Sequence, residues 1–130
     1  MPKISISYRR ADSAAIAGRI YDRLSAQYGE QAVFLDIDSI AVGADFRHQL
    51  QENLRASDLL LVIIGPGWLG KTPGGKTRIN ESHDPIRLEI ETALTLGLVI
   101  VPVLVGGAVM PRPDEVPFSL QDLTFRNANE

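Results

Sequence analysis

The sequence predicts an α/β domain with a doubly wound parallel sheet, and two observations support this fold class. Short apolar segments alternate with segments of helical periodicity along most of the chain. The central apolar segments, such as Leu-Leu-Leu-Val-Ile-Ile at residues 59–64, are uninterrupted, which is typical of parallel strands that helices cover on both faces. A chain of 130 residues has room for one domain of this kind, over residues 1–130.

Each expected element has a local signal. The predicted strands are residues 3–7, 32–36, 59–64 and 98–103, and the predicted helices are residues 13–28, residues 46–55 and a third that begins at Pro85. Apolar residues at helical spacing mark the buried faces of the first two helices: Ile16, Ile20 and Leu24, then Phe46, Leu50 and Leu54.

The third helix has the clearest boundaries. Asp84 suits the N-cap, because its carboxylate accepts a hydrogen bond from a main-chain N–H of the first turn, and Pro85 suits the first helical position. Gly97 is expected to end the helix. After residue 104 several prolines interrupt the pattern, so we expect only one helical turn over residues 119–123 and a short edge strand over residues 123–126.

Composition excludes several classes of function. The chain has no cysteine, which rules out disulfides, thiol catalysis and thiolate metal sites, and its two histidines argue against a zinc enzyme. With a net charge of -3, the chain lacks the excess of basic residues that is typical of a nucleic-acid-binding protein. No apolar segment is long enough to span a membrane and the N-terminus does not resemble a signal peptide. We therefore expect a cytoplasmic protein without a metal, nucleic acid or membrane partner.

Ligands of such sheets bind beyond the carboxyl ends of the strands, and the long loop over residues 65–82 lies there. It holds a G-x-G-x-x-G match at residues 65–70, but no helix opens within it, so a dinucleotide-binding turn is not predicted. Residues 70–77 match the P-loop pattern G-x-x-x-x-G-K-T, although the strand ends six residues earlier and residues 80–85 oppose a helix at Thr77. A P-loop NTPase therefore remains as the weakest alternative.

Several short segments occur in a familiar order. They are Ile-Ser-Ile-Ser-Tyr-Arg-Arg at residues 4–10, Val-Phe-Leu-Asp-Ile-Asp at 33–38, Gly-Ala-Asp-Phe at 43–46, the segment at 59–67, and the Pro85 helix with Val-Pro-Val at 101–103. In this order the chain resembles the Toll/interleukin-1 receptor (TIR) domain family, especially its bacterial members. The resemblance implies a flavodoxin-like sheet of five parallel strands in order 2-1-3-4-5. Only the closing C-terminal helix of that fold has no counterpart in the sequence.

The resemblance also implies two classes of function. Some TIR domains cleave the nicotinamide–ribose bond of NAD+ with a glutamate early in the helix after the third strand, and others are scaffolds that signal by self-association. Glu89, followed by Ile-Glu-Thr-Ala-Leu at residues 90–94, matches the catalytic glutamate. Pro85 stands where several enzymatic relatives carry a tryptophan, and Trp68 is the alternative aromatic wall. NAD+ would be the substrate, with no separate cofactor, and self-association with other TIR domains would complete the site.

The chemistry agrees with a single carboxylate. The nicotinamide of NAD+ is a cationic pyridinium that becomes neutral when it departs, so the leaving group needs no acid. One carboxylate then suffices to stabilise the positive charge that develops on the ribose. Glu91 is the competing candidate, but it lies roughly 3 Å further along the helix at 1.5 Å per residue, away from the crevice. We therefore predict that Glu89 is the catalytic residue.

Five further residues are candidates for substrate binding: Tyr8 for stacking, Arg9 for pyrophosphate, Asp36 for a ribose hydroxyl, Phe46 at a loop-to-helix junction and Trp68 as an exposed aromatic in a lid. Each has a structural alternative, namely packing for the aromatic residues, solvation for the arginine and loop capping for the aspartate. The sequence thus predicts an NAD+ glycohydrolase that releases nicotinamide and ADP-ribose or a cyclic isomer. The alternative is a non-catalytic scaffold that associates through residues 37–46 and the surface of the Glu89 helix.

Overall fold

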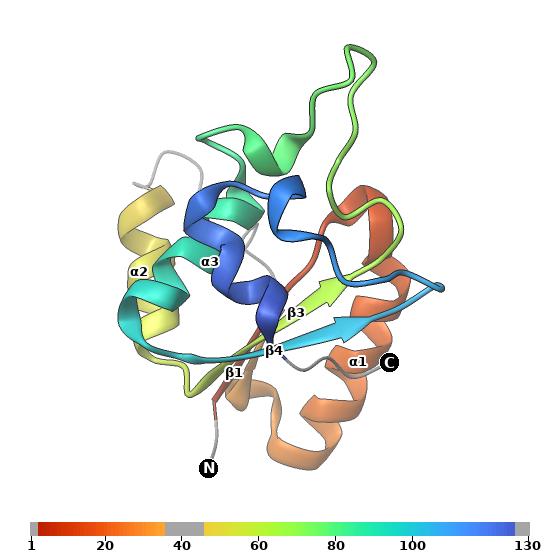
Figure 1. Ribbon diagram of the computed structural model, residues 1–130. Coiled ribbons are helices and arrows are strands. Elements are labelled where there is room, and N and C mark those ends of the chain that lie inside the picture. Colours follow the sequence, from red (N-terminus) through yellow and green to blue (C-terminus); the bar gives the residue numbers. More distant parts are fainter. Residues whose placement is uncertain (1–2, 36–45, 127–130) are drawn as a thin grey trace.

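The computed structural model describes residues 3–35 and 46–126, except for the side chains of residues 46 and 47. Its strands are β1 (Ile4–Ser7), β2 (Val33–Phe34), β3 (Leu59–Ile64) and β4 (Val99–Leu104). They form a parallel sheet in the order β2-β1-β3-β4 (Figure 1). From β1 the chain adds β2 on one side, and then crosses back to add β3 and β4 on the other side of β1. This strand order confirms the doubly wound α/β fold.

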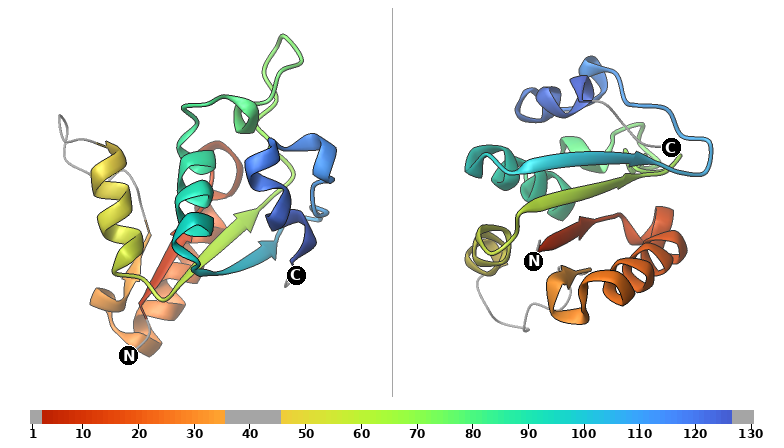
Figure 2. Two further views of the ribbon diagram at one scale, coloured as in Figure 1. Left: turned by 60° about the vertical axis from the view of Figure 1, so that its left-hand side comes forward. Right: turned by 90° about the horizontal axis from the view of Figure 1, so that it is seen from below.

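The helices cover both faces of the sheet (Figure 2). Helix α1 (Arg10–Tyr28) packs on one face, where Ala17 joins Ile4, Ile6 and Val33 in a buried cluster. Helices α2 (Phe46–Arg55) and α3 (Pro85–Leu96) pack side by side on the other face. None of the helices within the described ranges combines the length and the apolar content needed to cross a bilayer.

The sequence of β1, Ile-Ser-Ile-Ser, divides its side chains between the two faces. Ile4 and Ile6 point into the cluster under α1. Because successive side chains of a strand alternate, Ser5 and Ser7 point into the layer of α2 and α3, and both are buried. A central strand thus places two hydroxyl groups in an otherwise apolar layer.

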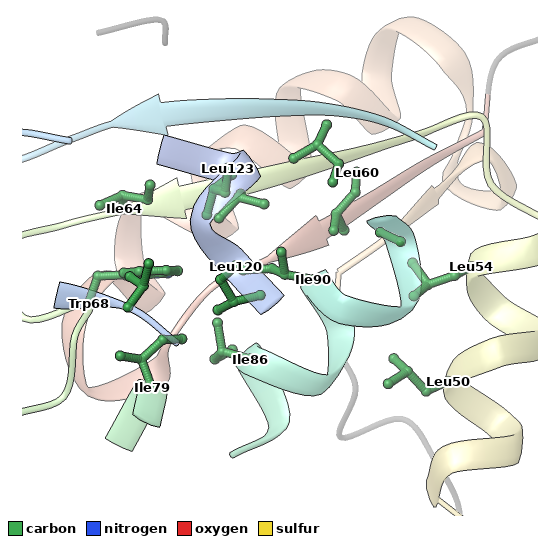
Figure 3. Close-up of a cluster of buried hydrophobic side chains, with 14 residues drawn as sticks. Leu50, Leu54, Leu60, Ile64, Trp68, Ile79, Ile86, Ile90, Leu120 and Leu123 are labelled. Atoms are coloured by element: carbon green, nitrogen blue, oxygen red, sulfur yellow. The ribbon is translucent and has the colours of Figure 1, made fainter. Parts of the chain in front are cut away.

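The larger core cluster lies in that layer (Figure 3). It includes Leu120 and Leu123 of the 3-10 helix η5 (Phe118–Phe125), both fully buried. A 3-10 helix has three residues per turn, so Leu120 and Leu123, which are three residues apart, lie on the same side and face the core. The predicted helical turn at residues 119–123 is therefore confirmed, and the predicted edge strand at residues 123–126 is wrong.

The boundaries of α3 agree with the sequence signals. The Arg87 N–H donates to the carboxylate of Asp84 over 3.2 Å, and Pro85 is the first helical residue. Gly97 closes the helix with a positive φ of 73°, a left-handed conformation that favours glycine, and its N–H donates to main-chain oxygens of the last turn. The chain then enters β4, which among the described residues pairs with β3 alone, and the Val105 N–H extends this ladder by donating to the Ile64 oxygen.

Candidate functional site

Glu89 lies in the second turn of α3 and points inward, with only 4% of its surface exposed. It lines a small cavity of about 20 Å³ between the sheet and α2. The other lining residues are Ser5, Ile6 and Phe34 from the sheet and Leu50, Asn53 and Leu54 from α2. Glutamate is seldom buried to this extent, and this burial distinguishes Glu89 from Glu91, the other carboxylate of α3.

Three serines, Ser5, Ser7 and Ser57, are buried in the domain, and Ser5 lines the cavity beside Glu89. The Oγ atoms of Ser5 and Ser57 lie 2.6 Å apart, and the Ser57 hydroxyl donates to the main-chain oxygen of Asn53 over 2.9 Å. Ser7 is 1% exposed, and its Oγ has no hydrogen-bond partner within the described ranges. Sequence reasoning missed these serines, although the polar positions of β1, a strand expected to be covered on both faces, were the available signal.

Glu91 has a different role. Its carboxylate accepts from Arg87 Nε over 2.9 Å and from the hydroxyl of Ser119 in η5. It therefore joins α3 to η5 at the surface, and its charge is already paired with a cation.

Arg9 is buried, and its guanidinium is held within the protein. Nη1 and Nη2 donate to the two carboxylate oxygens of Asp84, both over 2.9 Å, and Nε donates to the main-chain oxygen of Trp68 over 2.7 Å. This bidentate pair fixes the N-cap of α3 to the end of β1. Asp84 thus takes the position that the sequence analysis assigned to the pyrophosphate of a substrate.

Two other predicted binding residues, Trp68 and Tyr8, do not line the cavity beside Glu89. Trp68 is 1% exposed and belongs to the core cluster with Ile64 and Ile79 (Figure 3), so the prediction of an exposed aromatic lid is wrong. Tyr8 is half-buried and packs against the cluster under α1, on the opposite face of the sheet. Asp36 and the side chain of Phe46 lie outside the described residues.

The glycines of the G-x-G-x-x-G match have an internal explanation. The carboxylate of Asp12 in α1 accepts from the Gly65 N–H over 2.9 Å and from the Gly67 N–H over 2.7 Å. A Cβ atom on Gly65 would lie 2.5 Å from Asp12 Oδ2. The absence of a side chain lets the loop close on a carboxylate of the same chain.

Gly65→Ala should therefore lower the free energy of unfolding by about 1–3 kcal/mol, because the added methyl group overlaps the Asp12 carboxylate. Gly18→Ala is the matched control, since its Cβ atom would meet nothing within 4 Å inside α1. There the change should raise stability by about 0.5–1 kcal/mol. Urea unfolding followed by circular dichroism measures both, and a wild-type midpoint for Gly65→Ala would contradict the contact.

Residues 70–77, which match the P-loop pattern, form a hairpin that projects from the domain (Figure 1). Lys71 and Thr77 form an antiparallel bridge, and the Thr72 N–H donates to the Lys76 oxygen over 2.8 Å. The next element is a three-residue 3-10 helix, Arg78–Asn80, rather than an α-helix. A phosphate-binding loop needs a helix at this point, so the geometry argues against the NTPase alternative.

A wider pocket of about 670 Å³ lies at the base of this hairpin, beyond the ends of β3 and β4. Arg9, Lys71, Arg78 and Glu115 contribute its charged lining, and Glu89 is not among the residues that line it. Over the described ranges, histidine, aspartate and glutamate residues nowhere gather in a group of three that could hold a metal ion.

Comparison with known proteins agrees with the fold and identifies the family. The chain resembles the TIR domains of the activated Roq1 resistosome directly recognizing the pathogen effector XopQ, with a TM-score of 0.58 and 13% sequence identity. The match covers 98% of this chain and 72% of the Roq1 chain, and at this identity it supports the fold. The family model for the TIR domain matches residues 4–130. The protein therefore belongs to the TIR domain family.

Proposed function

We propose that this TIR domain cleaves the nicotinamide–ribose bond of NAD+ and that Glu89 is its catalytic carboxylate. The observation that carries the proposal is the burial of Glu89 in the second turn of α3, where it lines the same small cavity as Ser5 of β1. Buried carboxylates beside other polar groups are candidates for catalytic sites, because their surroundings alter how they interact with charge. The products are nicotinamide and ADP-ribose or its cyclic isomer.

The chemistry uses the charge of Glu89. As the C1′–N bond breaks, the pyridinium nitrogen takes the electron pair and becomes neutral, while the ribose gains positive charge. A carboxylate shielded from water stabilises this charge more strongly than one in bulk solvent. The reaction needs no acid for the leaving group and no separate cofactor, in contrast to ordinary glycoside hydrolysis.

Access to Glu89 requires a change in the domain. A cavity of about 20 Å³ cannot admit a ribose, and the residue is 4% exposed. Helix α2 covers Glu89 through Leu50 and Asn53, so substrate enters when α2 moves relative to α3. We propose that association with other TIR domains favours this open arrangement.

Nicotinamide release tests the proposed function. The protein is assayed with NAD+ as a dilute monomer and as a fusion to a self-assembling oligomeric domain. We expect release to rise on clustering, because clustering favours the open arrangement. The absence of release in the clustered, folded protein would refute the proposal.

One observation favours a second function, association without catalysis. Phe118 and Phe125 of η5 are 88% and 75% exposed, and exposed apolar side chains of this size are typical of interaction surfaces. A scaffold of this kind would self-associate without consuming NAD+. Replacing both phenylalanines by serine would then weaken association, which sedimentation measures independently of turnover.

The NTPase alternative is tested by Lys76→Ala, which removes the lysine of the P-loop match. Because Lys76 lies in the projecting hairpin and is exposed, nicotinamide release should stay at the wild-type rate. The wild-type protein should not hydrolyse ATP with magnesium. Hydrolysis of ATP that depends on Lys76 would overturn the argument from the hairpin geometry.

A further inference from the structure

We propose that the small cavity beside Glu89 binds one water molecule, and that this water is the nucleophile that converts the ribosyl cation into ADP-ribose. The water site follows from the cavity and its lining. The fate of the water rests on the proposed function, the cleavage of NAD+. The two parts are tested by separate measurements below.

The size and lining of the cavity suit a single water molecule. A water needs at least about 10–15 Å³ of such space and 2–4 polar partners, and the cavity measures about 20 Å³. Three of its seven lining residues are polar, namely Ser5, Asn53 and Glu89. In the closed domain the apolar remainder, from the sheet and α2, excludes further solvent. When α2 moves to admit substrate, Ser5 on β1 and Glu89 on α3 keep the water in place, because neither residue belongs to α2.

The orientation of the Ser5 hydroxyl follows from a count of protons. A serine hydroxyl has one proton to donate, and Ser57 donates its proton to the main-chain oxygen of Asn53. The short contact between the Ser57 and Ser5 oxygens therefore requires Ser5 to be the donor. On the side of the cavity, Ser5 can only accept a hydrogen bond.

This polarity orients the water. Its two O–H groups donate to the acceptors that line the cavity, Ser5 Oγ and the Glu89 carboxylate, so its lone pairs remain for reaction. When the C1′–N bond breaks and nicotinamide leaves with the electron pair, a lone pair of the water forms the C1′–O bond. The released proton passes to the Glu89 carboxylate and then to solvent, which balances the hydrolysis.

The site also decides between products. Without a positioned water, the same cation is captured by an adenine nitrogen of the same molecule, which gives the cyclic isomer, or by an added pyridine base, which gives an exchange product. The positioned water should therefore make linear ADP-ribose the main product of this chain.

Ser5→Val tests the fate of the water, because its methyl groups occupy the cavity and remove the acceptor. Ser57→Ala is the matched control: it breaks the same Ser5–Ser57 hydrogen bond but leaves the Ser5 oxygen in the cavity. With 3-acetylpyridine added to the clustered proteins, we compare ADP-ribose with exchange product per nicotinamide released. The ratio should fall about tenfold in Ser5→Val, the effect of roughly 1.4 kcal/mol, and less in Ser57→Ala.

An unchanged ratio in Ser5→Val would overturn the role of the water. If the valine variant does not fold, Ser5→Ala carries the same comparison, since it also removes the acceptor. The water itself is sought in crystals of the wild-type protein at high resolution, within hydrogen-bond distance of Ser5 and Glu89. It should be present in the wild type and absent in Ser5→Val, and its absence from the wild type would overturn the site whether or not the protein cleaves NAD+.

Discussion

Glu89→Gln is expected to lower nicotinamide release from NAD+ by roughly 10³-fold, the effect of removing a preorganised electrostatic group from a reaction centre. Glutamine keeps the size of the side chain and removes its negative charge. Glu89 is 4% exposed, and a neutral amide is easier to bury than a carboxylate, so the variant should still fold. The measurement is nicotinamide release from the clustered protein, with circular dichroism to establish folding.

Glu91→Gln is the matched control on the same helix. It removes the ion pair with Arg87 and weakens the contact with Ser119, which should cost about 0.2–1 kcal/mol of stability, as for other accessible pairs. Turnover should remain close to the wild-type rate. Full turnover by a folded Glu89→Gln protein would refute the catalytic role of Glu89. Equal losses of turnover in both variants would indicate an effect on the packing of α3 instead.

Arg9→Met should lower the free energy of unfolding by about 3–5 kcal/mol, the largest effect on stability that we expect. The substitution leaves the carboxylate of Asp84, whose side chain is 0% exposed, without its bidentate partner. Arg78 lies 3.9 Å away, but its side chain is 47% exposed, so it compensates weakly. The main-chain oxygen of Trp68 also loses its donor. Urea unfolding measures the change.

The double variant Arg9→Met with Asp84→Asn distinguishes two costs, the loss of the Arg9–Asp84 ion pair and the burial of an unpaired Asp84 carboxylate. Asparagine is a good N-cap and carries no charge, so α3 keeps its first-turn hydrogen bond. The double variant should therefore be more stable than Arg9→Met alone. A cost for Arg9→Met within the range of exposed pairs, about 0.2–1 kcal/mol, would contradict the burial argument.

The elements that were predicted closely are those with uninterrupted local signals. The bounds of α2 and β3 agree with the prediction, and α3 begins and ends at its expected caps. Helix α1 begins at Arg10 rather than residue 13, because a kinked first turn, with φ of -144° at Ser13, precedes the regular helix. Strand β2 is limited to Val33–Phe34 in the described ranges.

The candidate site was predicted only as far as local sequence allows. The place of Glu89 early in α3, beside the apolar stripe, was predicted, but its burial was not. The partners of Arg9 and Ser5 were not predicted either, because Asp84 and Ser57 lie 75 and 52 residues away along the chain. Trp68 was misjudged for the same reason: its glycine-rich loop looks solvated, whereas Asp12 draws the loop against the core.

The pairing of β4 limits how copies of this domain can associate. Because the Val105 N–H points to β3, alternation along the strand directs the nitrogen of Pro102 to the side away from β3. Proline has no N–H, so a strand added there would find no donor at the middle of β4. Pro102 thus opposes extension of the sheet at the β4 edge.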